Sequence, residues 1–206
     1  MAPRAADFFS RALGMLFAPG RTWDRIAGDP AAPGALMRGH VAPLAMIPAA
    51  CSLGGALTFG FNIADVDVRM SVGGLLLGAA VGYAVTLAGV WLAAVFVDVT
   101  APAFGGTRGR VEAMNLIGYG ATASWVAGVA EVYPSLAIPV GILAGLYSVY
   151  AVWLGLPKLM RIPDDQRLTA FAAVLVAILL LAAGRATLVG MARELGGPLS
   201  ASYAPR

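Results

Sequence analysis

Five long apolar runs constrain this chain more than any other feature of its sequence. Short segments with charged or turn-forming residues separate the runs, which cover roughly His40–Phe59, Val72–Val97, Ala113–Val132, Leu136–Leu156 and Leu168–Val189. Because about 20 consecutive apolar residues form a helix that crosses the hydrocarbon core of a bilayer, each run predicts one membrane-spanning helix. The low charged share, 12% of residues, is also unlike a soluble domain. The sequence therefore predicts an all-α, polytopic membrane protein with a bundle of five transmembrane helices.

The distribution of basic residues predicts how the chain is oriented. If the N-terminus is cytoplasmic, ten Lys and Arg residues lie on the cytoplasmic side and only three or four on the other. Positive charge is retained in cytoplasmic loops, so this orientation is favoured and the C-terminus is expected outside the cytoplasm. We expect three parts: a cytoplasmic or interfacial segment (1–38), the five-helix transmembrane domain (39–190) and a short extracytoplasmic tail (191–206).

The segment before the first apolar run has the pattern of an amphipathic helix. Its apolar residues near helical spacing are Phe8, Phe9, Leu13, Leu16 and Phe17, and Pro19-Gly20 ends the pattern. A helix with one apolar, aromatic face lies in the membrane interface, which is the expectation here. The alternative is a soluble helix packed against the loops. Charged residues interrupt the segment throughout, so it is not expected to be a cleaved signal peptide.

Small residues recur every four positions within three of the runs. The strips are Gly74, Gly78 and Gly82 in the second run, Gly120, Ser124 and Gly128 in the third, and Gly141 and Gly145 in the fourth. Small residues at this spacing let helix backbones approach closely within a membrane. They predict packing inside the bundle, with a homodimer face as the alternative.

Groups that could carry chemistry are scarce in the predicted spans. Glu131 stands at the outer end of the third run, Arg185 can extend to the outer interface, and His40 is expected as an interfacial residue at the mouth of the first run. Cys51 is the only cysteine, and the acidic pairs fall in loops. We therefore expect no enzyme activity, no catalytic or metal site and no cofactor. The scattered basic residues also argue against nucleic-acid binding.

The segment DVTAPAFGGTRG (98–109) follows the second run and contains a carboxylate, paired glycines and arginines. It lacks the phosphate-loop pattern, and no strand precedes it. A tight turn at the membrane surface is favoured over a phosphate cradle, with the arginines facing anionic headgroups. The residues of this juxtamembrane turn are Asp98, Pro102, Gly105, Gly106, Arg108 and Arg110.

Mild polar groups within the spans leave a second function open. They are Thr86, Asn115, Tyr119, Thr122, Ser124 and Ser148. If they converge on one cavity, they favour a small permease or lipid-handling protein for a neutral or amphipathic molecule. If each is satisfied by a neighbouring backbone carbonyl, they favour a protein that organises or escorts membrane components through helix contacts. A subunit of a larger complex would share the features of the latter.

Several motifs, taken in order, resemble those of bacterial Yip-domain membrane proteins. They are LFAPGRTWDRIA, HVAPLAMIPA, FGGTRGRVEAMNLIGYGATASWVAGV and LYSVYAVWLGLPKLMRIPDDQR, within about residues 10–190. The resemblance implies that Pro19, Trp23 and Ile26 anchor the N-terminal segment at the membrane and that Pro43 sets the geometry of the first helix. It also implies packing roles for Gly118, Tyr119 and Gly120 in the third helix and for Tyr147, Tyr150 and Gly155 in the fourth.

The resemblance does not transfer a known activity. Eukaryotic Yip proteins interact with Rab GTPases and carry an Asp-Leu-Tyr-Gly-Pro element that this chain lacks. Thirteen of the 14 basic residues are Arg, a bias that resembles a high-GC bacterium. The expected location is thus a bacterial plasma (inner) membrane. The expected partners are the lipid bilayer and other membrane proteins or a second copy, and no small-molecule ligand is assigned.

Overall fold

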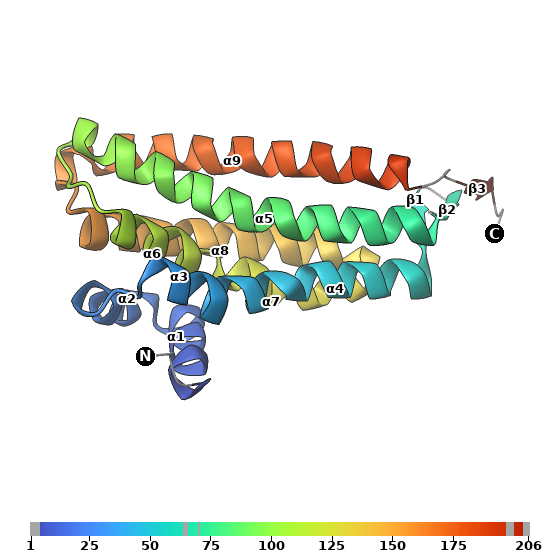
Figure 1. The fold of residues 1–206 in the computed structure, drawn as a ribbon, viewed down its shortest axis with the longest axis horizontal. Helices are drawn as coiled ribbons and strands as arrows, with labels where there is room; N and C mark the ends of the chain where they lie inside the picture. The colour runs from blue at the N-terminus through green and yellow to red at the C-terminus, as the bar shows by residue number, and fades with distance from the viewer. Residues whose placement is uncertain (1–4, 64–65, 70, 197–199, 204–206) are drawn as a thin grey trace.

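The computed structural model describes residues 5–63, 66–69, 71–196 and 200–203. Within them the chain forms an elongated helical bundle with two short helices packed beside one end (Figure 1). We call the end at which α4 begins and α9 begins the N-terminal end, at the left of Figure 1, and the other the C-terminal end. The all-helical architecture expected from the apolar runs is confirmed, apart from three short strands.

Four helices are long and apolar enough to cross a membrane. They are α3–η1–α4 (Pro33–Leu36, Met37–Val41 and Ala42–Phe59), α5 with η2 (Val72–Thr100 and Ala101–Phe104), α8 (Pro134–Met160) and α9 (Asp164–Leu195). Each contains one of the predicted apolar runs, and each extends several residues beyond it at one end or both. Helices continue past the apolar run because backbone hydrogen bonding does not stop at the edge of the hydrocarbon core.

The predicted third span is not one long helix. It consists of α6 (Arg110–Gly120), α7 (Thr122–Ala127) and the 3-10 helix η3 (Gly128–Val132). Thr122 donates a hydrogen bond from Oγ1 to the Tyr119 carbonyl, 2.6 Å away, at the first break. Glycine is also a poor helix former, and Gly118, Gly120 and Gly128 stand beside the breaks. The count of five long helices is therefore not confirmed, and four helices meet the length criterion among the described residues.

The first long helix contains a widened turn. Residues Met37–Val41 form a π-helical turn, and Pro43 follows in the first turn of α4. A proline inside a helix removes one backbone donor and crowds the preceding turn, and a π turn relieves that crowding. Pro43 thus stands where the helix geometry changes, without ending the helix.

Three short strands close the C-terminal end of the bundle. β1 (Phe61–Ile63) and β2 (Val66–Arg69) pair antiparallel, and β2 also pairs antiparallel with β3 (Ser200–Tyr203). The sequence predicted a charged, turn-forming segment between the first two spans and a short extracytoplasmic tail (191–206). Instead α9 continues to Leu195, and the residues after it add a strand to the hairpin.

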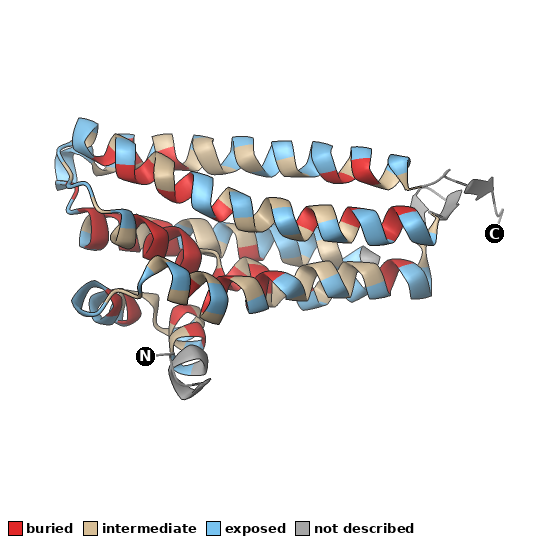
Figure 2. Ribbon diagram, viewed as in Figure 1, coloured by how far each residue is buried: buried red, intermediate tan, exposed pale blue. Residues whose placement is uncertain are grey.

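The densest packing lies at the N-terminal end. Buried segments gather there where α2, α6 and α8 meet, whereas exposed residues run along much of α9 (Figure 2). The largest fully buried side chains include Trp23, Ile26, Leu116, Leu156 and Met160, all in one core cluster. Long apolar faces without protein neighbours are expected where lipid surrounds a helix, because lipid tails solvate them as well as protein does.

Candidate functional site

Trp23 connects the N-terminal helices to the bundle. It lies on α2 (Pro19–Gly28), which starts with Pro19, and its side chain is fully buried together with Ile26. The indole Nε1 donates a hydrogen bond of 2.8 Å to the Ala151 carbonyl of α8. A Cβ added to Gly155 would lie 2.7 Å from Cε2 of the same ring. Two predicted motif residues, Trp23 and Gly155, are therefore the two sides of one contact.

Trp23 and Ile26, expected to anchor the N-terminal segment at the membrane, pack inside the protein. Both side chains are 0% exposed and belong to the protein core, so neither faces a lipid headgroup. They hold α2 to the protein instead. The absence of a side chain at Gly155 leaves space on α8 that the Trp23 ring occupies.

Asn115 holds the linker after α2. Its side chain is fully buried, its Oδ1 accepts from the Ala31 N–H at 3.0 Å, and its Nδ2 donates to the Ala31 carbonyl at 2.8 Å. The same Nδ2 also donates to the Val111 carbonyl. The Asn115 amide thus provides hydrogen-bond partners for both the N–H and the carbonyl of Ala31, which lies outside any helix. The sequence offered Asn115 only as a lining group for a transport path.

Tyr119 receives the side chain of Arg11 from α1 (Ala5–Phe17). Arg11 Nη1 donates to the Tyr119 hydroxyl at 3.1 Å, and Nη2 pairs with Asp29 at 3.1 Å. Partial burial opposes ionisation of Arg11, but Tyr119 and Asp29 raise its pKa above the ordinary value. The guanidinium therefore remains a cation that bridges α1, the end of α2 and α6.

His40, expected at the mouth of the first span, is buried in the protein next to Tyr119. It is 3% exposed, its Nε2 lies 2.9 Å from Thr122 Oγ1, and its ring centroid lies 4.4 Å from that of Tyr119. The break after α6 allows this contact, since it brings Thr122 toward the first long helix. Ser124, in contrast, bonds to Ser148 and the Ala144 carbonyl.

Tyr147 caps the end of α1. Its hydroxyl donates toward the carbonyls of Met15 and Leu16, at 3.1 and 2.6 Å. These are two of the last carbonyls of α1, which have no partner within their own helix. Tyr150 stacks edge-on against Tyr147 with 6.0 Å between centroids but is half exposed. Lys158 adds a hydrogen bond to the Gly20 carbonyl and an ion pair with Asp24.

We call this constellation the N-terminal docking site: Trp23, Asn115, Tyr119, Tyr147 and Gly155 with their partners on α1 and α2. Gly118 and Gly120 let α6 pack closely against the first long helix and α8 next to this site. A Cβ at Gly118 would lie 3.0 Å from Leu36, and one at Gly120 would lie 2.7 Å from Val152. The site brings together most of the motif residues that the resemblance singled out, and each contact is a packing or hydrogen-bonding contact within the chain.

The glycine strips have two different environments. Added Cβ atoms would meet Arg193 at Gly74 and Gly78, Val189 at Gly82 and Pro48 at Gly128, each within 3.2 Å. In the same segment as Gly128, Ser124 forms a 2.9 Å hydrogen bond with Ser148. Gly141 and Gly145 differ, because nothing in the described chain lies within 4 Å of an added Cβ. Packing inside the bundle, expected for both, does not occur there.

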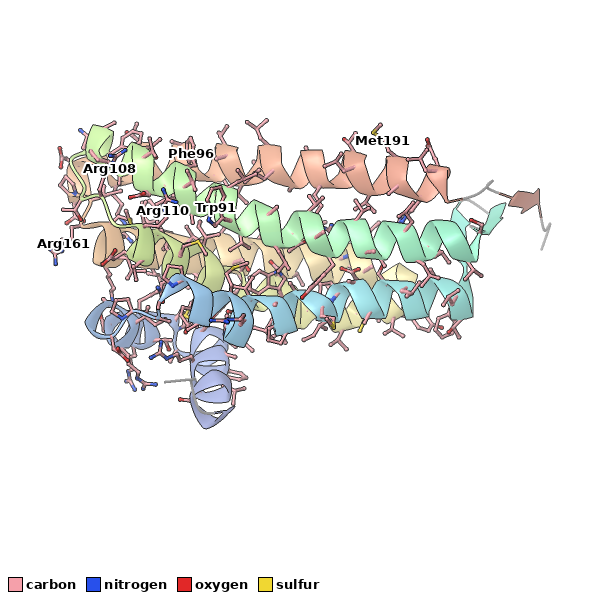
Figure 3. All side chains as sticks on the ribbon, in the orientation of Figure 1. Trp91, Phe96, Arg108, Arg110, Arg161 and Met191 are labelled. Carbon is pink, nitrogen blue, oxygen red and sulfur yellow. The ribbon has the colours of Figure 1, made fainter. Side chains whose placement is uncertain are left out.

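The juxtamembrane turn is held by Asp98. This carboxylate, largely buried, accepts from the Gly109 N–H at 3.0 Å and pairs with Arg110 Nε at 3.0 Å. Arg110 also lies over the ring of Trp91, 5.8 Å from its centroid, and Figure 3 shows the two side by side. Arg110 thus closes the loop, and Arg108 is exposed at the edge of the bundle.

The same turn is unsuited to a phosphate. Asp98 already occupies the N-terminal end of α6, the place where an anion would bind, and would repel a second anion. Gly105 takes a left-handed conformation (φ 74°) after Pro102, and a Cβ at Gly106 would lie 2.7 Å from the Met160 carbonyl. The glycines therefore serve the reversal of the chain and its close approach to the end of α8.

Among the described residues, the mild polar groups of the spans bind neighbouring backbone or side-chain groups. Thr86 donates to the Gly82 carbonyl, Thr122 to the Tyr119 carbonyl, and Ser124 to the Ala144 carbonyl or Ser148. A described groove of about 630 Å³ lies between α5 and α9 and is apolar. Its lining residues are Leu92, Phe96, Ala172, Ala173, Val176, Ala177, Leu180 and Leu181. No group of three or more potential metal ligands occurs among the described residues.

This arrangement defines a helical membrane protein whose N-terminal helices are fastened to its long spans by buried side chains. The chain belongs to the Yip1 domain family, whose model matches residues 13–185. The resemblance expected from the motifs is thus confirmed.

Curated proteins similar to this chain include the inner membrane protein YohC of Escherichia coli strain K12. It is 29% identical over 139 residues, which cover 66% of this chain and 71% of YohC. YohC of Escherichia coli O6:H1, strain CFT073, matches to the same extent. No solved structure matches the chain.

Proposed function

We propose that this Yip1-family protein is a non-enzymatic, multi-pass protein of a bacterial inner membrane that organises or escorts membrane components through helix contacts. The relatives named inner membrane protein support the location. The hydrogen-bonded polar groups support contact rather than transport or catalysis, because the side chains proposed to line a path bind neighbouring groups instead.

The broken segment α6–α7–η3 is the fifth crossing in this proposal. Three glycines mark its course: Gly118 lies against Val41, Gly128 against Pro48, and the Val132 carbonyl against Gly55. The segment thus runs parallel to the first long helix over most of its length. Breaks at membrane depth are tolerated where protein surrounds the backbone, and residues Ala113–Gly120 are buried.

Five crossings place the two ends of the chain on opposite sides of the membrane. The bias of basic residues then puts the N-terminal end of the bundle in the cytoplasm. A reporter that is active only outside the cytoplasm tests this topology. Fused after Arg206 it is expected to be active, and fused after Arg161 inactive; the reverse pattern contradicts the orientation.

Helix α1 is the interfacial helix of the proposal. It lies across the direction of the long helices in Figure 1, as a helix in the plane of the membrane would. One side packs on the bundle through Met15, whereas Leu13 and Phe17 are 53% and 82% exposed. An exposed apolar face beside the cytoplasmic ends of the spans is suited to the boundary between headgroups and acyl chains.

The observation that carries the contact function is the open glycine pair on α8. Gly141 and Gly145 leave space beside the helix, and the apolar residues around them, Ile138, Ile142 and Leu146, are exposed. A second helix can approach closely at such a pair, and dispersion contacts between closely packed backbones drive association in lipid. The surface therefore fits a helix of another membrane protein or of a second copy.

Extraction into native nanodiscs, followed by identification of co-purifying protein and lipid, tests the contact function. A stoichiometric protein partner or a second copy is expected, and Gly141→Leu with Gly145→Leu should remove it. The matched control is Gly89→Leu, since Gly89 also has open space beside it but lies on α5. A particle without a protein partner but enriched in one lipid or small molecule would instead support a permease or lipid-handling role.

A further inference from the structure

Two arginines of α9, Arg185 and Arg193, lie against the glycine strip of α5 (Gly74, Gly78 and Gly82). The N-terminal half of α5 packs antiparallel against the C-terminal half of α9, with Gly82 against Val189 and Gly74 against the Arg193 carbonyl. A Cβ at Gly78 would lie 2.5 Å from Cγ and 3.0 Å from Nε of Arg193. A larger residue at Gly78 would overlap the Arg193 side chain where it crosses α5.

The side chains of Arg185 and Arg193 extend toward each other along the glycine strip. Arg193 extends back from the end of α9 over Gly78. Arg185 extends the other way: its Nε donates to Thr86 Oγ1 at 2.9 Å, and its Nη2 lies 3.5 Å from the Cβ position of Gly82. Gly78 and Gly82 are one helical turn apart, about 6 Å along the axis. The two positively charged side chains of α9 therefore lie over adjacent turns of α5.

The described part of the chain supplies only part of the negative charge that would neutralise these two arginines. Glu131 of η3 lies within electrostatic reach of both cations. Neither arginine forms an ion pair within 4 Å in the described parts of the chain, and Arg193 Nε is buried without a hydrogen-bond partner. Among the described residues, Glu131 is the carboxylate that acts on both cations, so the pair keeps an excess positive charge there. An incompletely paired charge beside a membrane is costly and points to a ligand.

We propose that Arg185 and Arg193 bind the phosphate group of an anionic ligand between α5, α9 and η3. A guanidinium offers a planar fork of donors that matches phosphate oxygens, and two forks on adjacent turns contact one phosphate from two sides. The phosphate belongs either to a phospholipid of the leaflet at the C-terminal end of the bundle or to a soluble phosphate compound. Thr86 positions Arg185, and Glu131 limits the affinity by competing for the same donors. This site does not depend on the contact surface of α8.

Native mass spectrometry of the delipidated, detergent-purified protein tests the lipid source. Phosphatidylglycerol is expected to bind, whereas diacylglycerol with the same chains, which lacks the phosphate, is not. Arg185→Gln with Arg193→Gln should weaken phosphatidylglycerol binding by at least about tenfold, since two charge-assisted contacts are lost. The matched control is Arg108→Gln with Arg161→Gln, which removes the same charge at the other end and should leave the affinity unchanged.

A second arm tests the soluble source. Inorganic phosphate, added to the delipidated protein, should raise the melting temperature of the wild type but not of the Arg185→Gln, Arg193→Gln variant if the ligand is soluble. If the double variant does not fold, Glu131→Gln decides, because removing the competing carboxylate should tighten binding of whichever probe binds the wild type. The proposal is overturned if neither probe binds, if the control variant loses binding equally, or if Glu131→Gln leaves the affinity unchanged or lower.

Discussion

The indole of Trp23 occupies the space that a side chain at Gly155 would need, although 131 residues separate the two along the chain. Because the same ring donates a hydrogen bond to Ala151, the contact fixes both the position and the rotation of α2 on α8. It links the N-terminal helices, which carry the exposed apolar face of α1, to the long spans.

Gly155→Ala should therefore destabilise the protein. The new methyl group would lie 2.7 Å from both the Trp23 ring and Leu116, which are fully buried, so a core side chain would have to shift. Overpacking of this kind costs about 1–3 kcal/mol. Thermal unfolding in detergent, followed by circular dichroism, measures the effect. The control is Gly145→Ala on the same helix, where open space predicts no loss of stability; an equal loss in both variants would contradict the assignment.

Tyr147→Phe should loosen α1 while leaving the long helices intact. The change removes the hydroxyl that bonds to the carbonyls of Met15 and Leu16, a loss of about 1 kcal/mol. Hydrogen exchange should become faster in α1 and stay unchanged in α5 and α9. Tyr150→Phe serves as the control because Tyr150 is half exposed and its hydroxyl has no hydrogen bond in the described structure. Protection of α1 that survives Tyr147→Phe would argue against the cap.

Asn115→Leu should destabilise more than Ser148→Ala. Leucine has a similar size but leaves both backbone groups of Ala31 without partners, and each buried unpaired group costs about 1–3 kcal/mol. Ser148 only donates to or accepts from Ser124 in a partly buried site, so its loss is smaller. The two variants are compared by their unfolding midpoints in detergent. Equal midpoints would mean that the linker after α2 does not depend on the Asn115 amide.

The apolar runs predicted the four long helices because the cost of an unsatisfied backbone in lipid acts locally and leaves few alternatives. The third run was predicted as a regular helix, but its breaks depend on tertiary contacts, such as Gly128 against Pro48. The hydropathy of an apolar run carries no information about such contacts. Four long helices were therefore predictable, whereas the irregular one was not.

The sequence predicted which residues belong to the candidate site but not which of them contact one another. Motif resemblance singled out Trp23, Tyr119, Tyr147 and Gly155, yet only the fold shows their partners: Trp23 of α2 packs on Gly155 of α8, and the two tyrosines bind groups of α1. Glycine spacing shows where a neighbour can approach, and not whether one does. For that reason Gly78 and Gly145 look alike in sequence, while one lies under Arg193 and the other has no neighbour in the described chain.

Asp98 provides a last prediction, since two variants separate its two contacts. Asp98→Asn keeps an oxygen that accepts from the Gly109 N–H but loses the ion pair with Arg110, whose side chain is 45% exposed. An ion pair this exposed contributes less than about 1 kcal/mol. Asp98→Ala also leaves the amide at the start of α6 without its acceptor, adding about 1 kcal/mol. Limited proteolysis of the 101–109 loop should therefore be clearly faster in the alanine variant than in the asparagine variant. If both are cleaved equally fast, the ion pair, and not the backbone contact, holds the turn.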